Sequence, residues 1–368
     1  VAGAFVAQPM SGVLATRIGT RPVTRVASVL AGLVLALPAF ASSLPALVAA
    51  CALFGITRGA TEVPMNAQAS MLEARHARPR MSSFHACFSL GGTLGAALAA
   101  LLLRAGLEAR TSLTLVGVGC ALVAAVAGRY LLHDGPAASE DAPHSTGPRG
   151  AAVLRDGLLL ALGALAFCGL FGEGAMADWS ALLLERTTGA VPAAAALGYA
   201  AFSVAMTIGR LTGDAVVARA GSVRTLRTSG LLAAAGLVLA LVAPYGLALV
   251  GCAIVGLGYA NLVPILYSAS GRRAGSAGVA AVSTLGYTGF VVGPPAIGAL
   301  SGLFGSLAAA LGIVALLALG IAAGAGVAGR AVVATEPSAA ERRPRRASDA
   351  PDASASQASA SRPTSAAS

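Results

Sequence analysis

Long apolar runs, each close to the length that crosses a lipid bilayer, dominate this chain. Eleven runs can be delimited, at 1–15 (incomplete), 24–41, 45–72, 82–103, 112–132, 155–177, 192–215, 225–243, 247–269, 276–300 and 305–328. A helix needs about 20 mostly apolar residues to span the hydrocarbon core. Helices and closed barrels are the two structures that satisfy their backbone hydrogen bonds there, and runs of this length favour helices. The sequence therefore predicts an all-α membrane protein.

The composition excludes a water-soluble fold. Hydrophobic residues make up 56% of the 368 residues and charged residues 11%, whereas soluble domains carry about 25% charged residues. Five cysteines lie inside apolar runs without metal-ligand spacing. We therefore expect no metal site. We also expect no cofactor and no catalytic residue set, because the sequence shows neither a nucleotide loop nor a Ser, His and Asp set.

Arginines alternate between the loops in a way that orients the chain. All 25 basic residues are arginines. One set of loops, together with the C-terminal tail and counting Arg210, holds 21 of them, and the alternate loops hold Arg104, Arg110 and Arg186. The positive-inside rule places the larger set in the cytoplasm. We expect a multi-pass protein of a bacterial cell membrane with a cytoplasmic C-terminus, in contact with lipid and without a nucleic-acid partner.

Three weak matches indicate an internal repeat. Arg17 and Gly19 match Arg219 and Gly221 at an offset of 202 residues. Gly59 with Glu62 then matches Gly258 with Asn261 at 199, and Gly91 with Gly95 matches Gly289 with Gly293 at 198. Repeats of this kind are typical of transporters built from two halves. We predict a bundle at 1–132, a cytoplasmic linker at 133–154, a second bundle at 155–328 and a disordered cytoplasmic tail at 329–368. Since five runs precede the linker and six follow it, we expect that one helix is missing at the front.

The segment GVLATRIGTR, residues 12–21, resembles the loop between helices two and three of the major facilitator superfamily. Thr16 stands where that family usually has Asp, whereas the second half keeps an acid, Asp214. The segments GATEVPMNAQASMLE, SSFHACFSLGG, EGAMADWSALLL and GYANLVPILYSASG are similar to the fucose-permease-like branch. The resemblance implies a fold of two pseudo-symmetric six-helix bundles. We expect that eleven of these twelve helices are present here. It also implies gating by loop charges against helix ends, for which the candidates are Arg17, Gly19, Arg21, Asp214 and Arg219.

The strongest candidate site lies in the run 45–72. Arg58, Glu62 and Asn66 are four residues apart, so they share one face of a helix. Ionisable residues at bilayer depth cost about 2.5–3.5 kcal/mol and usually face a cavity or a partner. We predict that Glu62 exchanges a proton and that Arg58 tunes it, and the resemblance implies the same role for this glutamate. A buried ion pair that only holds the helix in place is the alternative.

Other polar residues within the runs are candidates for substrate binding. They are Asn66, His85, Glu173, Tyr259, Asn261 and Tyr287. Glu173 lies between Gly172 and Gly174, which suggests close approach of the substrate or of a neighbouring helix. A structural role remains open for each: His85 can be an interfacial residue, and Asn261 can hold helices together.

No nucleophile–base set or nucleotide loop is present, so we expect no enzyme. We expect a proton-coupled secondary transporter that moves a small polar, sugar-like solute by alternating access, acting as a monomer. Its partners are the solute, protons and lipid. A proton-driven drug efflux antiporter is the alternative within transport. A non-transporting membrane receptor or an inactive truncated remnant is the alternative of another class.

Overall fold

The computed structural model describes residues 2–76, 78–133 and 155–333, and these residues form helices without a strand. The predicted linker at 133–154 and the tail at 329–368 lie almost entirely outside the described residues. The first helices are α1 (Ala2–Ile18), α2 (Thr20–Val34), α3 (Leu44–His76), α4 (Met81–Arg104) and α5 (Ala109–Ala127). They are followed by α6 (Gly157–Thr188), the short α7 (Pro192–Ala195), α8 (Leu197–Ala220), α9 (Ser222–Val242), α10 (Tyr245–Tyr259), α11 (Leu262–Phe304) and α12 (Leu307–Val333). Short 3-10 turns, Leu37–Phe40 and Gly128–Tyr130, extend α2 and α5.

Eight stretches of described helix are long and apolar enough to cross a membrane. One of them, Tyr245–Phe304, is 60 residues long and contains two of the predicted runs. Its backbone leaves helical geometry at Ala274 and Gly275, where Gly275 has φ 56° and ψ −142°. The all-α membrane fold expected from the apolar runs is thus confirmed.

The predicted run at 247–269 differs from the structure because it contains a helix break. α10 ends at Tyr259, and α11 begins at Leu262 with Asn261 as its N-terminal flanking residue. The apolar pattern continues through the break because both sides of it are buried: Tyr259, Ala260 and Leu262 are each at most 3% exposed.

Equivalent helix pairs pack in the two halves. α1 packs on α3, and α8 packs on α10. α2 likewise packs on α5, and α9 on α12. Small residues make these crossings close: Gly32 of α2 meets Gly117 of α5, and Gly230 of α9 meets Ala318 and Ala322 of α12. Such residues let membrane helices approach each other where water supplies no hydrophobic driving force.

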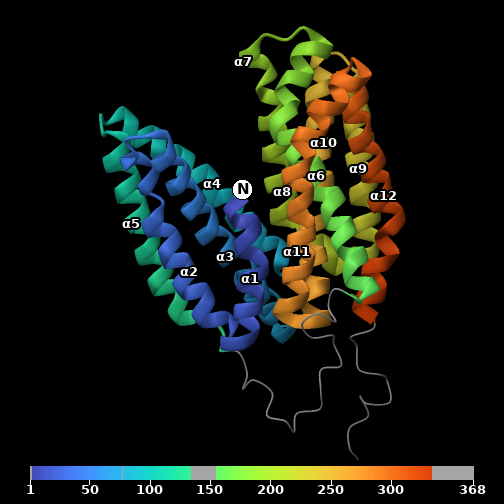
Figure 1. The fold of residues 1–368 in the computed structure, drawn as a ribbon. Coiled ribbons are helices and arrows are strands. Elements are labelled where there is room, and N and C mark those ends of the chain that lie inside the picture. Colours follow the sequence, from blue (N-terminus) through green and yellow to red (C-terminus); the bar gives the residue numbers. More distant parts are fainter. Residues whose placement is uncertain (1, 77, 134–154, 334–368) are drawn as a thin grey trace, which may run out of the picture. The chain divides into compact units, whose positions relative to one another are not determined.

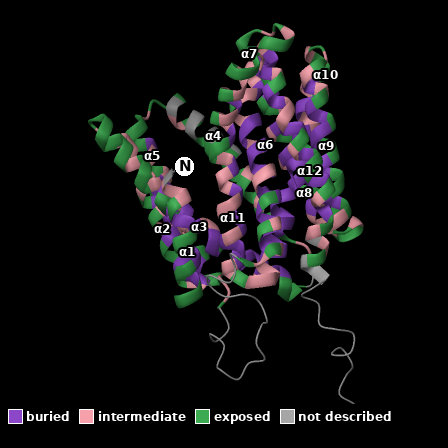
Figure 2. Cartoon of the chain, turned by 45° about the vertical axis from the view of Figure 1, so that its right-hand side comes forward, coloured by how far each residue is buried: buried purple, intermediate pink, exposed green. Residues whose placement is uncertain are grey.

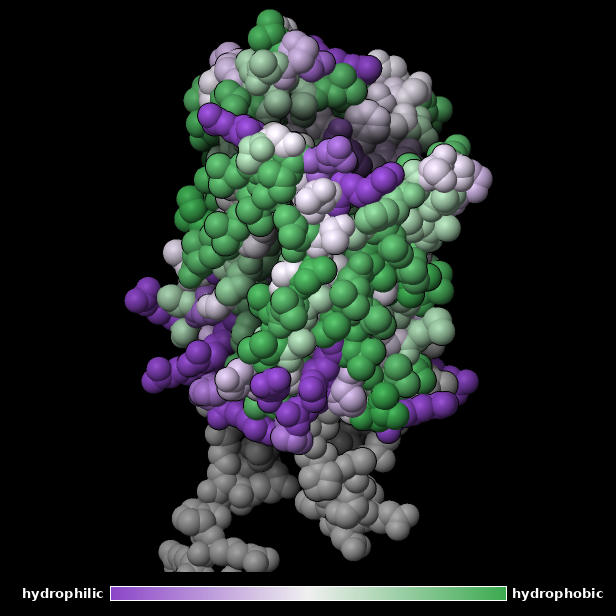
Figure 3. Space-filling model, turned by 90° about the vertical axis from the view of Figure 1, so that its left-hand side faces the viewer, coloured by the Kyte–Doolittle hydropathy of each residue, from purple (hydrophilic) through white to green (hydrophobic). Residues whose placement is uncertain are grey.

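The group α1–α5 and the group α6–α12 meet through α1 on α11, α3 on α11, and α4 on α8. Figure 1 shows the ribbons of the two groups approaching each other at the end where α1 passes into α2 and α4 begins. This end carries Arg17, Arg75, Arg80, Arg219 and Arg272, and we call it the basic end. Figure 3 shows hydrophilic side chains gathered at this end, below a hydrophobic band. Figure 2 shows that most of the buried residues belong to α6 and α8–α12.

Candidate functional site

A cavity of about 520 Å³ lies between the two helix groups. Helices α3, α4, α6, α8 and α11 contribute its walls, together with residues 130–132, at and after the 3-10 turn that follows α5. Six of the residues singled out in the sequence line it: Arg58, Glu62, Asn66, His85, Glu173 and Tyr287. The structure therefore brings together candidates from four helices that are up to 229 residues apart in the sequence.

The α3 wall of the cavity has the geometry that the four-residue spacing predicts. Arg58 Nη2 lies 3.8 Å from Glu62 Oε2, in an ion pair between residues one turn apart. Asn66 Nδ2 donates to the Glu62 backbone carbonyl at 2.8 Å and approaches its Oε1 at 3.3 Å. The Glu62 side chain is 12% exposed, and that of Arg58 is 34% exposed. Glu62 is therefore a largely buried carboxylate whose ion-pair partner stays accessible from the cavity.

Rings from both helix groups also meet in the lining of the cavity. His85 of α4 lies edge-on to Tyr267 of α11, with 6.0 Å between the ring centroids. His85 Nε2 is buried without a hydrogen-bond partner among the described residues. Tyr287, further along α11, also lines the cavity. On the α3 side, the Arg58 guanidinium stands over the Phe88 ring at 5.4 Å.

A second ion pair connects the two helix groups. Arg210 Nη2 of α8 lies 3.6 Å from Glu173 Oε1 of α6. Arg210 Nη1 donates to Ser89 Oγ of α4 at 2.8 Å. The assignment of Arg210 to a cytoplasmic loop is wrong, because the residue lies inside α8 and is 6% exposed. The apolar run predicted at 192–215 already contained Arg210, so counting it with the loops was inconsistent with the predicted span.

Tyr259 and Asn261 do not line the cavity. Tyr259 is 3% exposed, and its hydroxyl packs against Gly172 of α6. Asn261 Oδ1 accepts a hydrogen bond from Ser82 Oγ of α4 at 2.9 Å, and Asn261 Nδ2 donates to the Gly209 carbonyl at 3.2 Å. Asn261 therefore connects α11 to α4 and α8, although its repeat mate Glu62 faces the cavity.

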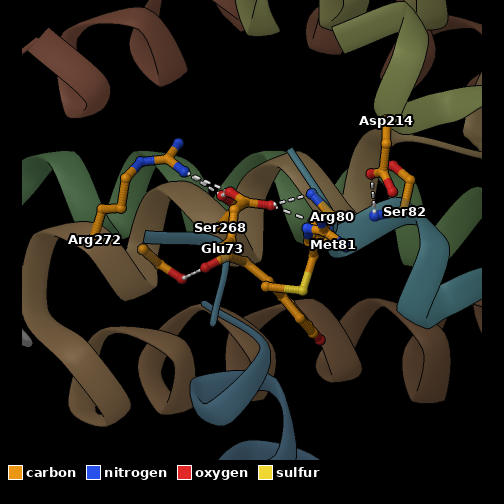
Figure 4. A network of polar contacts seen from close by, with 9 residues as sticks. Glu73, Arg80, Met81, Ser82, Asp214, Ser268 and Arg272 are labelled. Atoms are coloured by element: carbon orange, nitrogen blue, oxygen red, sulfur yellow. Dashed lines mark hydrogen bonds and ion pairs between the residues drawn. The ribbon is translucent and has the colours of Figure 1, made fainter. Parts of the chain in front are cut away.

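Glu73, at the end of α3, is the centre of a polar network at the basic end (Figure 4). Its Oε1 lies 2.8 Å from Arg272 Nη1 of α11 and accepts a hydrogen bond from the Ser268 hydroxyl. Its Oε2 accepts from the backbone N–H groups of Arg80 and Met81 at 2.9 and 3.0 Å. Four donors thus stabilise one buried carboxylate. Both the ion pair and the Ser268 bond join the two helix groups.

Asp214 makes a second contact between the groups at the same end. The Ser82 and Ser83 N–H groups, in the first turn of α4, donate to Asp214 Oδ1 and Oδ2 at 2.9 and 3.0 Å. The Ser83 hydroxyl donates to the same carboxylate. An acidic side chain is favourable at a helix N-terminus, where backbone N–H groups lack partners within the helix.

The remaining gating candidates lie at or beside the turns that connect α1 to α2 and α8 to α9. Arg17 and Arg219 are exposed near the ends of α1 and α8. Arg21 Nη2 donates to the Arg129 carbonyl at 3.1 Å, within the α1–α5 group. Thr16 donates to the Val13 carbonyl of its own helix at 2.7 Å. The acid that bridges the two helix groups in this part of the repeat is therefore Asp214, in the second half.

Sequence reasoning missed Glu73, Ser268 and Arg272 because their partners are distant in the chain. One signal was available. The 199-residue offset that relates Glu62 to Asn261 also relates Glu73 to Arg272. These repeat mates are paired with each other, which requires them to lie near the pseudo-twofold axis of the repeat. Within the described residues, no group of three His, Cys, Asp or Glu side chains is placed to hold a metal ion.

Comparison with known proteins identifies relatives across most of the chain. The family model described as Major Facilitator Superfamily matches residues 1–294. An uncharacterized MFS-type transporter of Yersinia pestis is 36% identical over 314 residues, which cover 84% of this chain and 79% of the relative. An uncharacterized transporter of Sinorhizobium fredii is 34% identical over 328 residues, which cover 84% of this chain and 85% of the relative.

The fold is similar to that of FucP. A single-substitution variant of the E. coli fucose:proton symporter FucP gives a TM-score of 0.76 at 17% identity, covering 89% of this chain and 88% of that one. FucP in the outward conformation gives 0.73 at 16% identity, covering 89% and 87%. At this identity the likeness establishes the fold alone, and it confirms the fucose-permease-like fold. Together with the family match, it shows that this chain belongs to the Major Facilitator Superfamily and is a multi-pass membrane transporter, not an enzyme.

Proposed function

We propose that the chain is a proton-coupled secondary transporter that moves a small polar solute across the cell membrane by alternating access. The observation on which this proposal depends is the Arg58–Glu62 pair in the wall of the central cavity. A carboxylate that is largely buried but faces a cavity can exchange a proton with it. A neighbouring arginine that moves between states changes the free energy of that exchange.

The charged and titratable groups around Glu62 come from every helix that lines the cavity. They are Arg58 of α3, His85 of α4, Glu173 of α6, Arg210 of α8, and Tyr267 and Tyr287 of α11. α1 packs on α3, and its one ionisable side chain, Arg17, is at the basic end. Any motion of the two helix groups changes the distances among these charges, which supports coupling of protonation to the conformational change.

The distribution of the arginines supports an orientation of the chain in the membrane. We assign the basic end to the cytoplasm by the positive-inside rule. The contacts of Glu73 and Asp214 hold the two helix groups together at this end. The structure then corresponds to a state closed toward the cytoplasm, in keeping with its likeness to FucP in the outward conformation.

The substitution Glu62→Gln tests the proposal. We expect it to abolish uptake driven by a pH gradient in proteoliposomes while counterflow exchange continues, because exchange needs no net proton transfer. The probes are radiolabelled monosaccharides, polyols and sugar acids, each assayed with and without a pH gradient. The exposed Glu108→Gln, at the start of α5, is the matched control and should behave as wild type. Gradient-driven uptake at the wild-type rate in Glu62→Gln would reject the role of Glu62.

The cavity lining also favours a second candidate, a proton-driven efflux antiporter for amphipathic drugs. The low aromatic content of the whole chain, 5%, argues against an aromatic cavity. The cavity is nevertheless lined by Met65, Phe84, Phe88 and Leu72 next to its charged residues. Uptake of ethidium into inverted vesicles on imposing an inside-acidic pH gradient, which corresponds to efflux from the cell, would support this candidate. If neither assay detects transport, the receptor or remnant alternative would be favoured.

A further inference from the structure

Arg210 is a buried cation on the wall of the cavity whose hydrogen-bonding capacity is only partly used. The residue is 6% exposed, and its Nε has no hydrogen-bond partner among the described residues. Nη1 donates to Ser89, and the Glu173 carboxylate is 3.6 Å from Nη2, beyond the usual length of a charge-assisted hydrogen bond. Because a buried unsatisfied donor is costly, this arrangement is more favourable when an acceptor in the cavity completes it.

We infer that Arg210 is a specificity-determining residue that binds a carboxylate of the transported solute, which is a small polar monoanion of the sugar-acid class. The planar guanidinium presents its donors in the fork geometry that matches a carboxylate. The cavity volume of about 520 Å³ lies within the range of about 300–1,000 Å³ that small-molecule sites occupy. Asn66 and Tyr287 are among the other polar residues that line the cavity, and they supply groups for hydroxyls.

The charge balance of the cavity favours a monoanion. With all four groups ionised, Arg58 and Arg210 balance Glu62 and Glu173. If Glu62 carries the transported proton, as the proposed function has it, the cavity bears one net positive charge and an anionic solute restores neutrality. By linkage, the proton and the anion then strengthen each other's binding.

Equilibrium binding of matched pairs tests the assignment. The probes are radiolabelled D-gluconate with D-glucitol, and D-glucuronate with D-glucose, in equilibrium dialysis against the purified full-length protein in detergent at pH 6. We expect at least one acid to bind about tenfold or more tightly than its neutral mate. Arg210→Gln should weaken binding of that acid by about 10- to 100-fold and leave the neutral mate within about twofold.

A second substitution, which should change the affinity for the acid in the opposite direction, separates solute recognition by Arg210 from a purely structural role. Glu173→Gln removes the carboxylate that competes for Arg210, so it should strengthen binding of the acid by several-fold. A pair that only supports the fold would weaken binding in both variants. The exposed Arg186→Gln, on the same helix as Glu173, is the control and should match wild type.

Three outcomes overturn the assignment: equal binding of the acid and its neutral mate, binding of the neutral mates alone, or binding of neither member of either pair. Weakened acid binding in Glu173→Gln would also overturn it. Dialysis involves no gradient and no net transport. A protein that prefers the acid but fails the gradient assay would therefore reject proton coupling and leave the role of Arg210 intact.

Discussion

Gly172 has no side chain because the Tyr259 ring occupies the space that one would need. A Cβ built on Gly172 would collide with the Tyr259 hydroxyl, and Tyr259 itself is 3% exposed in the core of the second helix group. Gly174, two residues on, faces the backbone of Phe290 with 3.4 Å between its added Cβ and the Phe290 carbonyl oxygen. The two glycines around Glu173 therefore allow neighbouring helices to approach closely. This is one of the two interpretations, substrate or helix approach, that the sequence left open.

At the residue scale we predict that Gly172→Ala destabilises the protein. The buried Tyr259 cannot withdraw without disturbing its own neighbours, so the cost should be about 1–3 kcal/mol, typical of overpacking. The measurement is the midpoint of thermal unfolding in detergent. Gly92→Ala, in α4, is the control, because nothing lies within 4 Å of its added Cβ; alanine should stabilise that helix by up to about 1 kcal/mol. Equal midpoints for the two variants would contradict the packing argument.

At the element scale, glycines and a capping aspartate determine how consecutive helices are connected. α1 passes into α2 at Gly19 with φ 94° and ψ 155°, and α8 passes into α9 at Gly221 with φ 78° and ψ 157°. The two turns are repeat mates with nearly the same backbone geometry, and a positive φ is far more accessible to glycine than to other residues. α6 begins in a different way, with Asp156 as its N-cap.

Asp156 binds the start of α6 to the end of the first part of α11. Its Oδ1 accepts from the Leu158 N–H at 2.9 Å, and its Oδ2 lies 2.6 Å from Arg273 Nε. Desolvation raises the pKa of Asp156, but the hydrogen bonds from Arg273 and from the backbone outweigh it, so the pKa lies below its usual value. A carboxyl with a lowered folded-state pKa stabilises the fold above its unfolded pKa, and this contribution is lost as the pH falls through the folded value.

We therefore predict that Asp156→Asn reduces the acid sensitivity of the protein. Wild-type stability should decline below about pH 4, where unfolded aspartate binds protons, and the variant should decline less in that window. At pH 7 the variant should be less stable by about 1 kcal/mol, as for loss of a helix cap. Unfolding midpoints between pH 3 and pH 7 check both points. Asp178→Asn, at an exposed site on the same helix, should keep the wild-type profile.

At the scale of the whole molecule, two carboxylates hold the helix groups together at the basic end. Glu73 pairs with its own repeat mate Arg272, and Asp214 accepts from the first turn of α4 (Figure 4). If the two helix groups move as in the proposed alternating-access mechanism, each of these contacts should contribute to the balance between its two states.

We predict that Asp214→Ala shifts the protein toward a state with the basic end open. Losing a carboxylate at a helix N-terminus costs about 1–2 kcal/mol, which changes the ratio of the two states by about 5- to 30-fold. Spin labels at Arg78→Cys and Arg224→Cys, in a background without the five native cysteines, report the distance across this end. In Asp214→Ala, a population with a longer distance between the two labels should appear. Thr212→Ala, whose hydroxyl bonds within its own helix, is the control, and an unchanged distribution in Asp214→Ala would rule out this role.

Local spacing made part of the site predictable. Arg58, Glu62 and Asn66 depend on the 3.6-residue period of one helix, so their mutual contacts follow from the sequence. Arg210 and Glu173 are on different helices and pair only because α6 and α8 cross beside the cavity. The break at Ala260 and Asn261 could not be predicted, because hydropathy does not distinguish a buried helix from a buried interruption.

By itself, the sequence determined that this chain crosses a membrane as helices and is built from two related halves. This was possible because a bilayer admits few backbone structures, and because the lengths of the apolar runs and the spacing of the repeat can be measured in the sequence. The tertiary structure alone decided which polar residues share the cavity and which hold its two sides together. Glu62 and its repeat mate Asn261 differ in surroundings because Asn261 finds hydrogen-bond partners on α4 and α8, whereas Glu62 faces the cavity beside Arg58.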